Sequence, residues 1–149
     1  MKPLVVLIGG FCIALLAIRF IGGSFDYPLS GRIAMSVMLL FTALGHFLYP
    51  RGMAMMLPAV IPLKEGVVYL TGLIEIGAAV GLLIPRSKVT IGWLLIAFFI
   101  CTLPANINAA IKRVDLQKGT LDGPGPAYLW FRVPLQVLFI LWTYFSAIR

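Results

Sequence analysis

The chain has 149 residues, of which 61% are hydrophobic and 11% are charged. A soluble domain carries about 25% charged residues, so this composition excludes a protein surrounded by water alone and indicates a membrane protein. The net charge of +7 comes from single basic residues near the ends of apolar runs, where lysine and arginine meet anionic lipid headgroups. We therefore expect the lipid bilayer as a partner and no nucleic acid.

Five apolar runs approach the length that a helix needs to cross a hydrocarbon layer. Because helices satisfy their own backbone hydrogen bonds in lipid, the sequence predicts an all-α fold, a polytopic membrane helical bundle that forms a single membrane domain over residues 1–149. The first run has no small-residue cleavage site, so we interpret it as a retained span and not as a signal peptide. The expected spans are residues 3–21, 32–48, 66–84, 89–111 and 127–148.

Short turns and longer connections alternate between the two sides of the predicted bundle. Residues 24–31 and 85–88 form short turns on one side, which we call side B. On the other side, side A, residues 49–66 are apolar but interrupted by two prolines, which favours a segment lying at the membrane surface. Residues 112–128 are polar and rich in glycine and proline. We also place the N-terminus at side A, and a small excess of basic residues there favours a cytoplasmic side A.

Four of the expected spans carry two polar residues four positions apart, which places both members on one face of a helix. Polar side chains in membrane helices face the bundle interior or a cavity, not lipid. We therefore expect the four faces to point at a common centre, in the half of the membrane nearest side A. The pairs are Thr42 and His46, Thr71 and Glu75, Thr102 and Asn106, and Arg132 and Gln136.

Glu75 lies near the middle of its span, where an ionised carboxylate costs roughly 3 kcal/mol on insertion scales. It must be protonated, paired or hydrogen-bonded. We expect Arg132, Gln136 or His46 to satisfy it. Three interpretations of the polar cluster stay open at this point: a structural hydrogen-bonded network, a ligand pocket, and a site of proton transfer.

The candidate pocket consists of six members of these pairs and two further residues that lie nearer side A. Its expected members are His46, Tyr69, Thr71, Glu75, Asn106, Asn108, Arg132 and Gln136. On the face of the third span opposite Glu75, Gly77 and Gly81 are expected to let a neighbouring helix pack closely. No metal site is expected, because one histidine without a nearby cysteine cannot form a zinc site. Without a Cys-x-x-Cys motif, a dithiol redox site is not expected either.

At these residues the sequence resembles the DoxX-like membrane proteins, over roughly residues 31–148. The motifs are GHF at 45–47, Glu75 ahead of GLLIPR at 81–86, PANI at 104–107 and RVPLQ at 132–136. The resemblance implies a four-helix core with a polar interior, to which the first span is an addition. Relatives in that family are associated with thiosulfate:quinone oxidation and with membrane oxidoreductase assemblies, and most have no assigned activity.

Together these features favour a binding or accessory protein over an enzyme, and no residue is assigned a catalytic role. The expected ligand or cofactor is quinone-like or lipid-like. One alternative is a redox-associated enzyme subunit in which Glu75 and His46 transfer protons to a bound quinone. Another is a structural partner or assembly factor of a larger membrane complex. A membrane protein or a second copy of the chain is the expected protein partner, and the bacterial inner membrane is the expected location.

Overall fold

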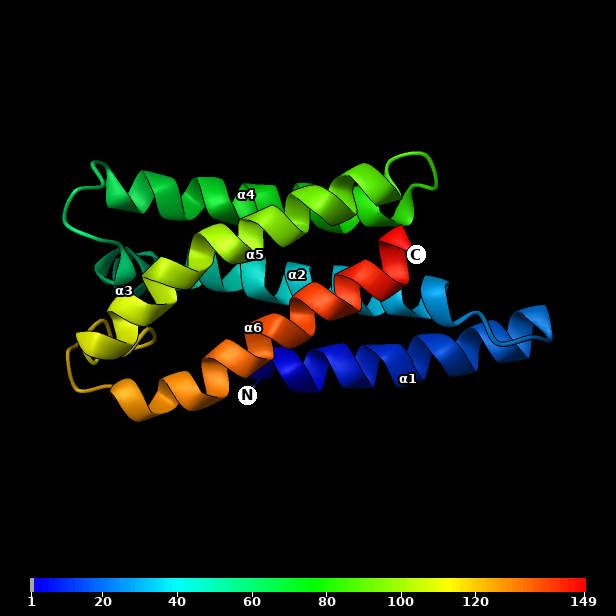
Figure 1. Ribbon diagram of the computed structural model, residues 1–149, viewed down its shortest axis with the longest axis horizontal. Coiled ribbons are helices and arrows are strands. Elements are labelled where there is room, and N and C mark those ends of the chain that lie inside the picture. The colour runs from blue at the N-terminus through cyan, green and yellow to red at the C-terminus, as the bar shows by residue number, and fades with distance from the viewer. Residues whose placement is uncertain (1) are drawn as a thin grey trace.

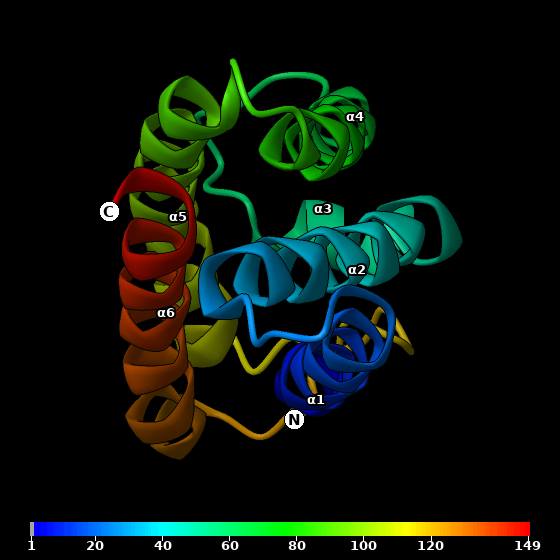
Figure 2. The same ribbon diagram turned by 90° about the vertical axis from the view of Figure 1, so that its right-hand side faces the viewer.

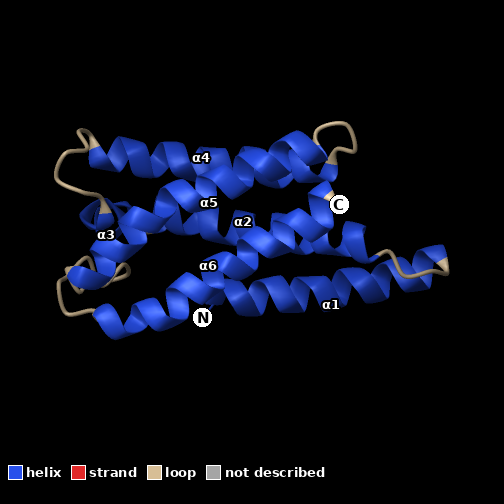
Figure 3. Ribbon diagram, in the orientation of Figure 1, coloured by secondary structure: helices blue, strands red, loops and turns tan. Residues whose placement is uncertain are grey.

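The computed structural model describes residues 2–149, which form a bundle of helices (Figure 1) joined by short loops (Figure 3). Five helices in this range are long and apolar enough to cross a membrane, which confirms the all-α membrane bundle expected from the sequence. The elements are α1 (Lys2–Gly22), α2 (Tyr27–Leu48), α3 (Pro50–Met56), α4 (Lys64–Leu83), α5 (Lys88–Ile111), η1 (Pro126–Tyr128), α6 (Leu129–Thr143) and η2 (Tyr144–Ile148).

α2 lies at the centre of the bundle. Seen from the side B end, it has α1 on one side and α4 on the other, while α5 and α6 run along a third side (Figure 2). Its fully buried residues include Met35, Met38 and Leu39, which belong to the same apolar core as Leu7 of α1 and Leu82 of α4. Polar residues on α2 can therefore meet neighbours from several helices.

Side-chain hydrogen bonds and a proline mark the ends of the helices at the side B turns. α2 starts before the expected residue 32, because the side chain of Asp26 accepts a hydrogen bond from the backbone N–H of Leu29 at 2.9 Å and caps the first turn. α4 ends ahead of Pro85, and the hydroxyl of Ser87 donates to the carbonyl oxygen of Gly81 at 2.8 Å. These contacts close the short side B turns, so consecutive helices run in opposite directions.

α1 is shifted along the bundle axis relative to the other long helices. It begins beside the middle of the bundle, and its far end extends past them on side B (Figure 1). A Cβ atom on Gly10 would lie 3.5 Å from the Cα of Ala34. At 1.5 Å per residue, Lys2 lies about 12 Å from Gly10 toward side A. Thr42 lies about the same distance from Ala34 in the same direction, so Lys2 is level with Thr42. The expected placement of the N-terminus at the side A end is therefore corrected, because α1 begins beside the middle of the bundle (Figure 1).

Three glycines of α4 have different neighbours. A Cβ on Gly72 would lie 2.9 Å from the Cβ of His46, and one on Gly81 would lie 2.7 Å from Cγ1 of Ile91. α4 therefore approaches α2 closely at Gly72 and α5 closely at Gly81. A Cβ on Gly77 would meet no atom within 4 Å, and this glycine borders a small gap between α4 and α5. A close helix contact thus exists at Gly81 and not at Gly77.

The side A connections pack against each other and cover one end of the bundle. A Cβ on Gly52 of α3 would overlap the carbonyl oxygen of Leu116, so glycine is needed for the 113–125 loop to approach α3. The amide of Asn108 donates to the carbonyl oxygen of Met56 at 2.6 Å. This bond ties the end of α3 to α5, and the first side A connection is held as a short surface helix.

Candidate functional site

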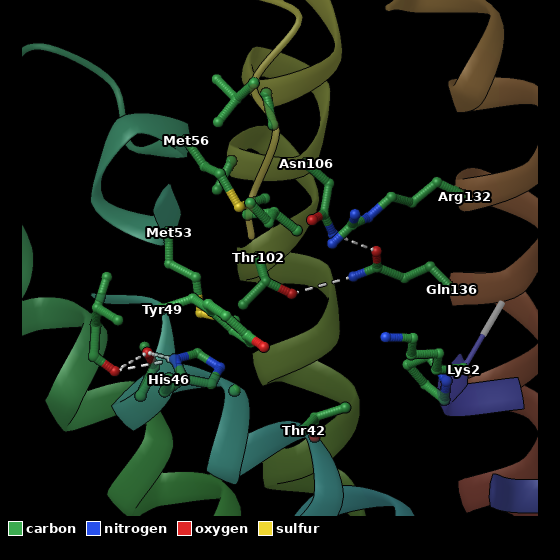
Figure 4. A pocket seen from close by; sticks show the side chains of 18 of the residues that line it. Lys2, Thr42, His46, Tyr49, Met53, Met56, Thr102, Asn106, Arg132 and Gln136 are labelled. Carbon is green, nitrogen blue, oxygen red and sulfur yellow. Dashed lines mark hydrogen bonds between the residues drawn. The ribbon is translucent and has the colours of Figure 1, made fainter. Parts of the chain in front are cut away.

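A cavity of about 690 Å³ lies inside the bundle. α2, α4, α5 and α6 form its walls, the side chain of Lys2 reaches into it from α1, and Met53 and Met56 of α3 border it (Figure 4). Its lining is mostly apolar, and the polar side chains form two walls on different helix pairs. The volume falls within the range of small-molecule sites, about 300–1,000 Å³.

The first of these, the α2–α4 wall, consists of Thr42, His46, Thr71 and Glu75. His46 Nε2 lies 3.5 Å from Glu75 Oε1, and Thr42 Oγ1 donates to Glu75 Oε2 at 2.9 Å. Glu75 is buried, and each of its carboxylate oxygens has a partner. The wall therefore satisfies its own charge, as a carboxylate at this depth requires.

The other nitrogen of His46 defines the tautomer of the ring. Nδ1 lies 3.0 Å from the carbonyl oxygen of Val68 and 3.0 Å from Thr71 Oγ1, and Thr71 Oγ1 donates to the same carbonyl oxygen at 2.8 Å. A carbonyl oxygen only accepts hydrogen bonds, so we assign a hydrogen to Nδ1. Nε2 then faces Oε1 of Glu75.

The second, the α5–α6 wall, consists of Thr102, Asn106, Arg132 and Gln136. Asn106 Nδ2 donates to Gln136 Oε1 at 2.8 Å. Gln136 Nε2 donates to Thr102 Oγ1 at 3.1 Å and to the carbonyl oxygen of Phe99. The buried amide of Gln136 thus uses both hydrogens and its oxygen, and it joins α5 to α6 through neutral groups.

Arg132 carries the charge of the α5–α6 wall. Its guanidinium carbon lies 5.9 Å from the ring centroid of Tyr128, and its half-buried side chain extends toward Asn106 (Figure 4). Within residues 2–149, no carboxylate lies within 4.0 Å of its nitrogens. Of the three partners expected for Glu75, His46 is therefore confirmed, and Arg132 and Gln136 belong to the other wall. Thr42, which was not among the expected partners, is the second one.

Two expected pocket residues lie outside the cavity lining. Tyr69 stacks on Phe47 with ring centroids 5.9 Å apart and is 39% exposed. The side-chain amide of Asn108 donates its hydrogen bond to α3. The reason is helix geometry: at about 100° per residue, Tyr69 lies well away from the face of Glu75, and Asn108 points away from the face of Asn106.

Lys2, Thr42 and Thr102 line the cavity, although they were not among the expected pocket members. The two threonines had a usable signal, because each lies four positions before an expected member on the same helix face. Lys2 had none, since the sequence pattern carries no information on the shift of α1. Among residues 2–149, no three His, Cys, Asp or Glu side chains gather as a metal site requires.

Residues 35–147 match the model of a family described as a domain of unknown function (DUF8561). The matched segment begins within α2 and ends in η2, so it contains both walls of the cavity, whereas α1 and Lys2 precede it. No curated protein and no solved structure matches the chain.

Proposed function

The chain belongs to this family of unknown function, and from the geometry of its cavity we propose that it is a membrane protein that binds a small amphipathic ligand, quinone-like or lipid-like. The observation that carries the proposal is the space of about 690 Å³ bordered by the two polar walls. A purely structural network would need no such space. A mostly apolar enclosure with a few convergent polar groups is the usual form of a small-molecule site.

The distribution of the lining residues supports an amphipathic ligand in particular. Met38, Phe98, Phe99 and Phe139 provide apolar contact area of the kind that accommodates a hydrocarbon body. The imidazole of His46 and the polar groups of the α5–α6 wall can donate hydrogen bonds to a polar head. A wholly polar ligand would leave the aromatic lining without a partner, and a wholly apolar ligand would leave buried polar groups unused.

A substitution that fills the cavity tests this proposal. Leu135 lines the cavity, whereas Leu141, on the same helix, is 49% exposed on the surface. We expect Leu135→Trp to remove co-purifying small molecules from gently extracted protein, and Leu141→Trp to retain them, as measured by native mass spectrometry. If wild-type protein carries no small molecule and binds neither a quinone nor a lipid when these are added, the proposal is wrong.

A second candidate function is favoured by the contact between His46 and Glu75. An imidazole and a carboxylate in contact, beside a cavity of ligand size, are groups suited to proton transfer with a bound quinone. We expect Glu75→Gln to abolish any quinone-dependent redox turnover while leaving quinone binding in place. Unchanged optical spectra of the protein with several quinones, under oxidising and reducing conditions, would exclude this role.

The DoxX-like resemblance of the matched region supports two finer parts of the proposal. These are a location in the bacterial inner membrane and an accessory role beside another membrane protein or a second copy of the chain. Both are tested by native mass spectrometry of protein extracted from that membrane, since the same spectrum reports bound partners and bound small molecules.

A further inference from the structure

The cationic and anionic side chains that line the cavity are not paired with each other. Each of the two carboxylates in the lining has partners within the protein. Glu75 contacts Thr42 and His46. Asp115 accepts hydrogen bonds from the backbone N–H groups of Gln117 and Lys118 in its own loop, at 2.9 and 3.1 Å. The two permanent cations, Lys2 and Arg132, have no carboxylate within 4.0 Å in the part of the chain that the structure describes.

Lys2 and Arg132 come from different helices and both border the same space (Figure 4). Lys2 is brought there by the shift of α1, which places its first turn level with Thr42. Lys2 is exposed, and a lysine in contact with hydrocarbon is costly unless it meets an opposite charge. Arg132 presents a planar fork of N–H donors that matches a carboxylate or a phosphate.

The end of α1 adds to this positive potential. The N-terminal end of a helix carries a partial positive charge of about half a unit, and the first turn of this helix contains no acidic residue. A lysine in that position is unfavourable with respect to the helix dipole. An anion beside Lys2 would be stabilised by the side chain and by the dipole together.

From this convergence we infer that the ligand of the cavity is an anionic amphiphile, whose carboxylate or phosphate group is bound by Arg132 and Lys2 while its apolar part lies against the aromatic lining. The inference rests on the proposed function, because it names the class of ligand. A fatty acid and an acidic phospholipid share this chemistry. A neutral quinone does not, since it brings no charge that could pair with the two cations.

The test compares ligands that differ in charge. Wild-type protein in a neutral maltoside detergent at pH 8 is titrated with oleate, dioleoyl phosphatidate, oleyl alcohol and a short-chain ubiquinone, and binding is followed by native mass spectrometry and thermal shift. We expect oleate or phosphatidate to bind at least about tenfold more tightly than oleyl alcohol, because hydrogen bonds to charged groups are stronger than neutral ones. Binding of oleate alone indicates a fatty acid, and binding of phosphatidate alone indicates a phospholipid.

Variants assign the preference to the cavity. We expect Arg132→Gln to lower the affinity for the acidic ligand by about tenfold or more and to leave that for oleyl alcohol unchanged. Lys2→Gln acts in the same direction. Arg51 lies on α3, is exposed and does not line the cavity, so Arg51→Gln controls for charge near the headgroups and should change neither affinity. If Arg132→Gln does not fold, Arg132→Lys replaces it and should keep the preference for the acid. The comparison of the four ligands on the wild-type protein does not depend on either variant.

The different failures are distinguishable. Equal binding of oleate and oleyl alcohol to the wild type, or tighter binding of the ubiquinone, overturns the anionic ligand and leaves the proposed function intact. A preference for the acid that persists in Arg132→Gln and in Lys2→Gln also overturns the inference, since the charge would then be recognised elsewhere. If none of the four molecules binds, the proposed function fails together with the inference.

Discussion

The two walls of the cavity contain similar numbers of polar groups but use them differently. On the α2–α4 wall, the charge of Glu75 is matched within the protein by His46 and Thr42. On the α5–α6 wall, the neutral amide of Asn106 donates to that of Gln136, while the charge of Arg132 has the face of Tyr128 beside it. The charged residue of the α2–α4 wall therefore has polar partners within the protein, whereas that of the α5–α6 wall has no carboxylate partner.

This difference separates groups that hold the bundle together from groups that are free to bind a ligand. Removing one partner of a buried ion pair strongly lowers the stability of the protein, because the remaining charge is left uncompensated in the apolar interior. An unpaired charge at the edge of a cavity contributes little to stability and can contribute to binding. We therefore expect substitutions of the charged pair on the α2–α4 wall to lower stability, and substitution of Arg132 on the α5–α6 wall to lower ligand affinity.

The largest effect is expected for His46→Ala. This change leaves the carboxylate of Glu75 without its imidazole partner and should lower the free energy of unfolding by about 3 kcal/mol. Unfolding of the detergent-solubilised protein by a denaturing detergent, followed by circular dichroism, measures the loss.

A second substitution identifies the cause of that loss. In the His46→Ala background, Glu75→Gln removes the unpaired charge and should recover most of the lost stability. If the double variant is as unstable as His46→Ala alone, the loss comes from packing and the two walls do not differ in the way proposed.

A smaller effect is expected at the backbone that supports the α2–α4 wall. Gly72→Ala places a methyl group 2.9 Å from the Cβ of His46, so the helices must separate at the ion pair, at a cost of about 1–3 kcal/mol. Gly77→Ala is the matched control on the same helix, since it meets no atom within 4 Å and should be neutral or slightly stabilising. Thermal unfolding of the two variants under identical conditions measures the difference; equal melting temperatures would show that the close approach at Gly72 is dispensable.

Much of the cavity could be predicted from helical periodicity. The spacing of Thr42 and His46, or of Arg132 and Gln136, places each pair on one face, and the cost of burying polar groups in lipid turns those faces inward. The same geometry, applied strictly, excludes Tyr69 and Asn108 from the pocket. The depth of these two residues in their helices favours the pocket, but depth does not determine the direction in which a side chain points.

The pairing across the cavity could not be predicted in the same way. Whether Glu75 meets His46 or Arg132 depends on how far each helix is rotated and shifted against its neighbours, which is decided by packing at single positions such as Gly72 against His46 and Gly10 against Ala34. Apolar runs of similar length do not encode such shifts. The entry of Lys2 into the cavity follows from one of these shifts and has no counterpart in the hydropathy pattern.

The smallest effect on stability is expected for Arg132→Gln, and it is the sharpest test of the comparison. Because the guanidinium has no carboxylate partner among residues 2–149, its loss removes no ion pair, and the cost of holding a charge inside the bundle disappears with it. The free energy of unfolding should therefore stay the same or rise, while His46→Ala lowers it in the same assay. A loss of about 3 kcal/mol for Arg132→Gln would mean that this charge is matched within the protein after all, and both walls would then have to be regarded as structural.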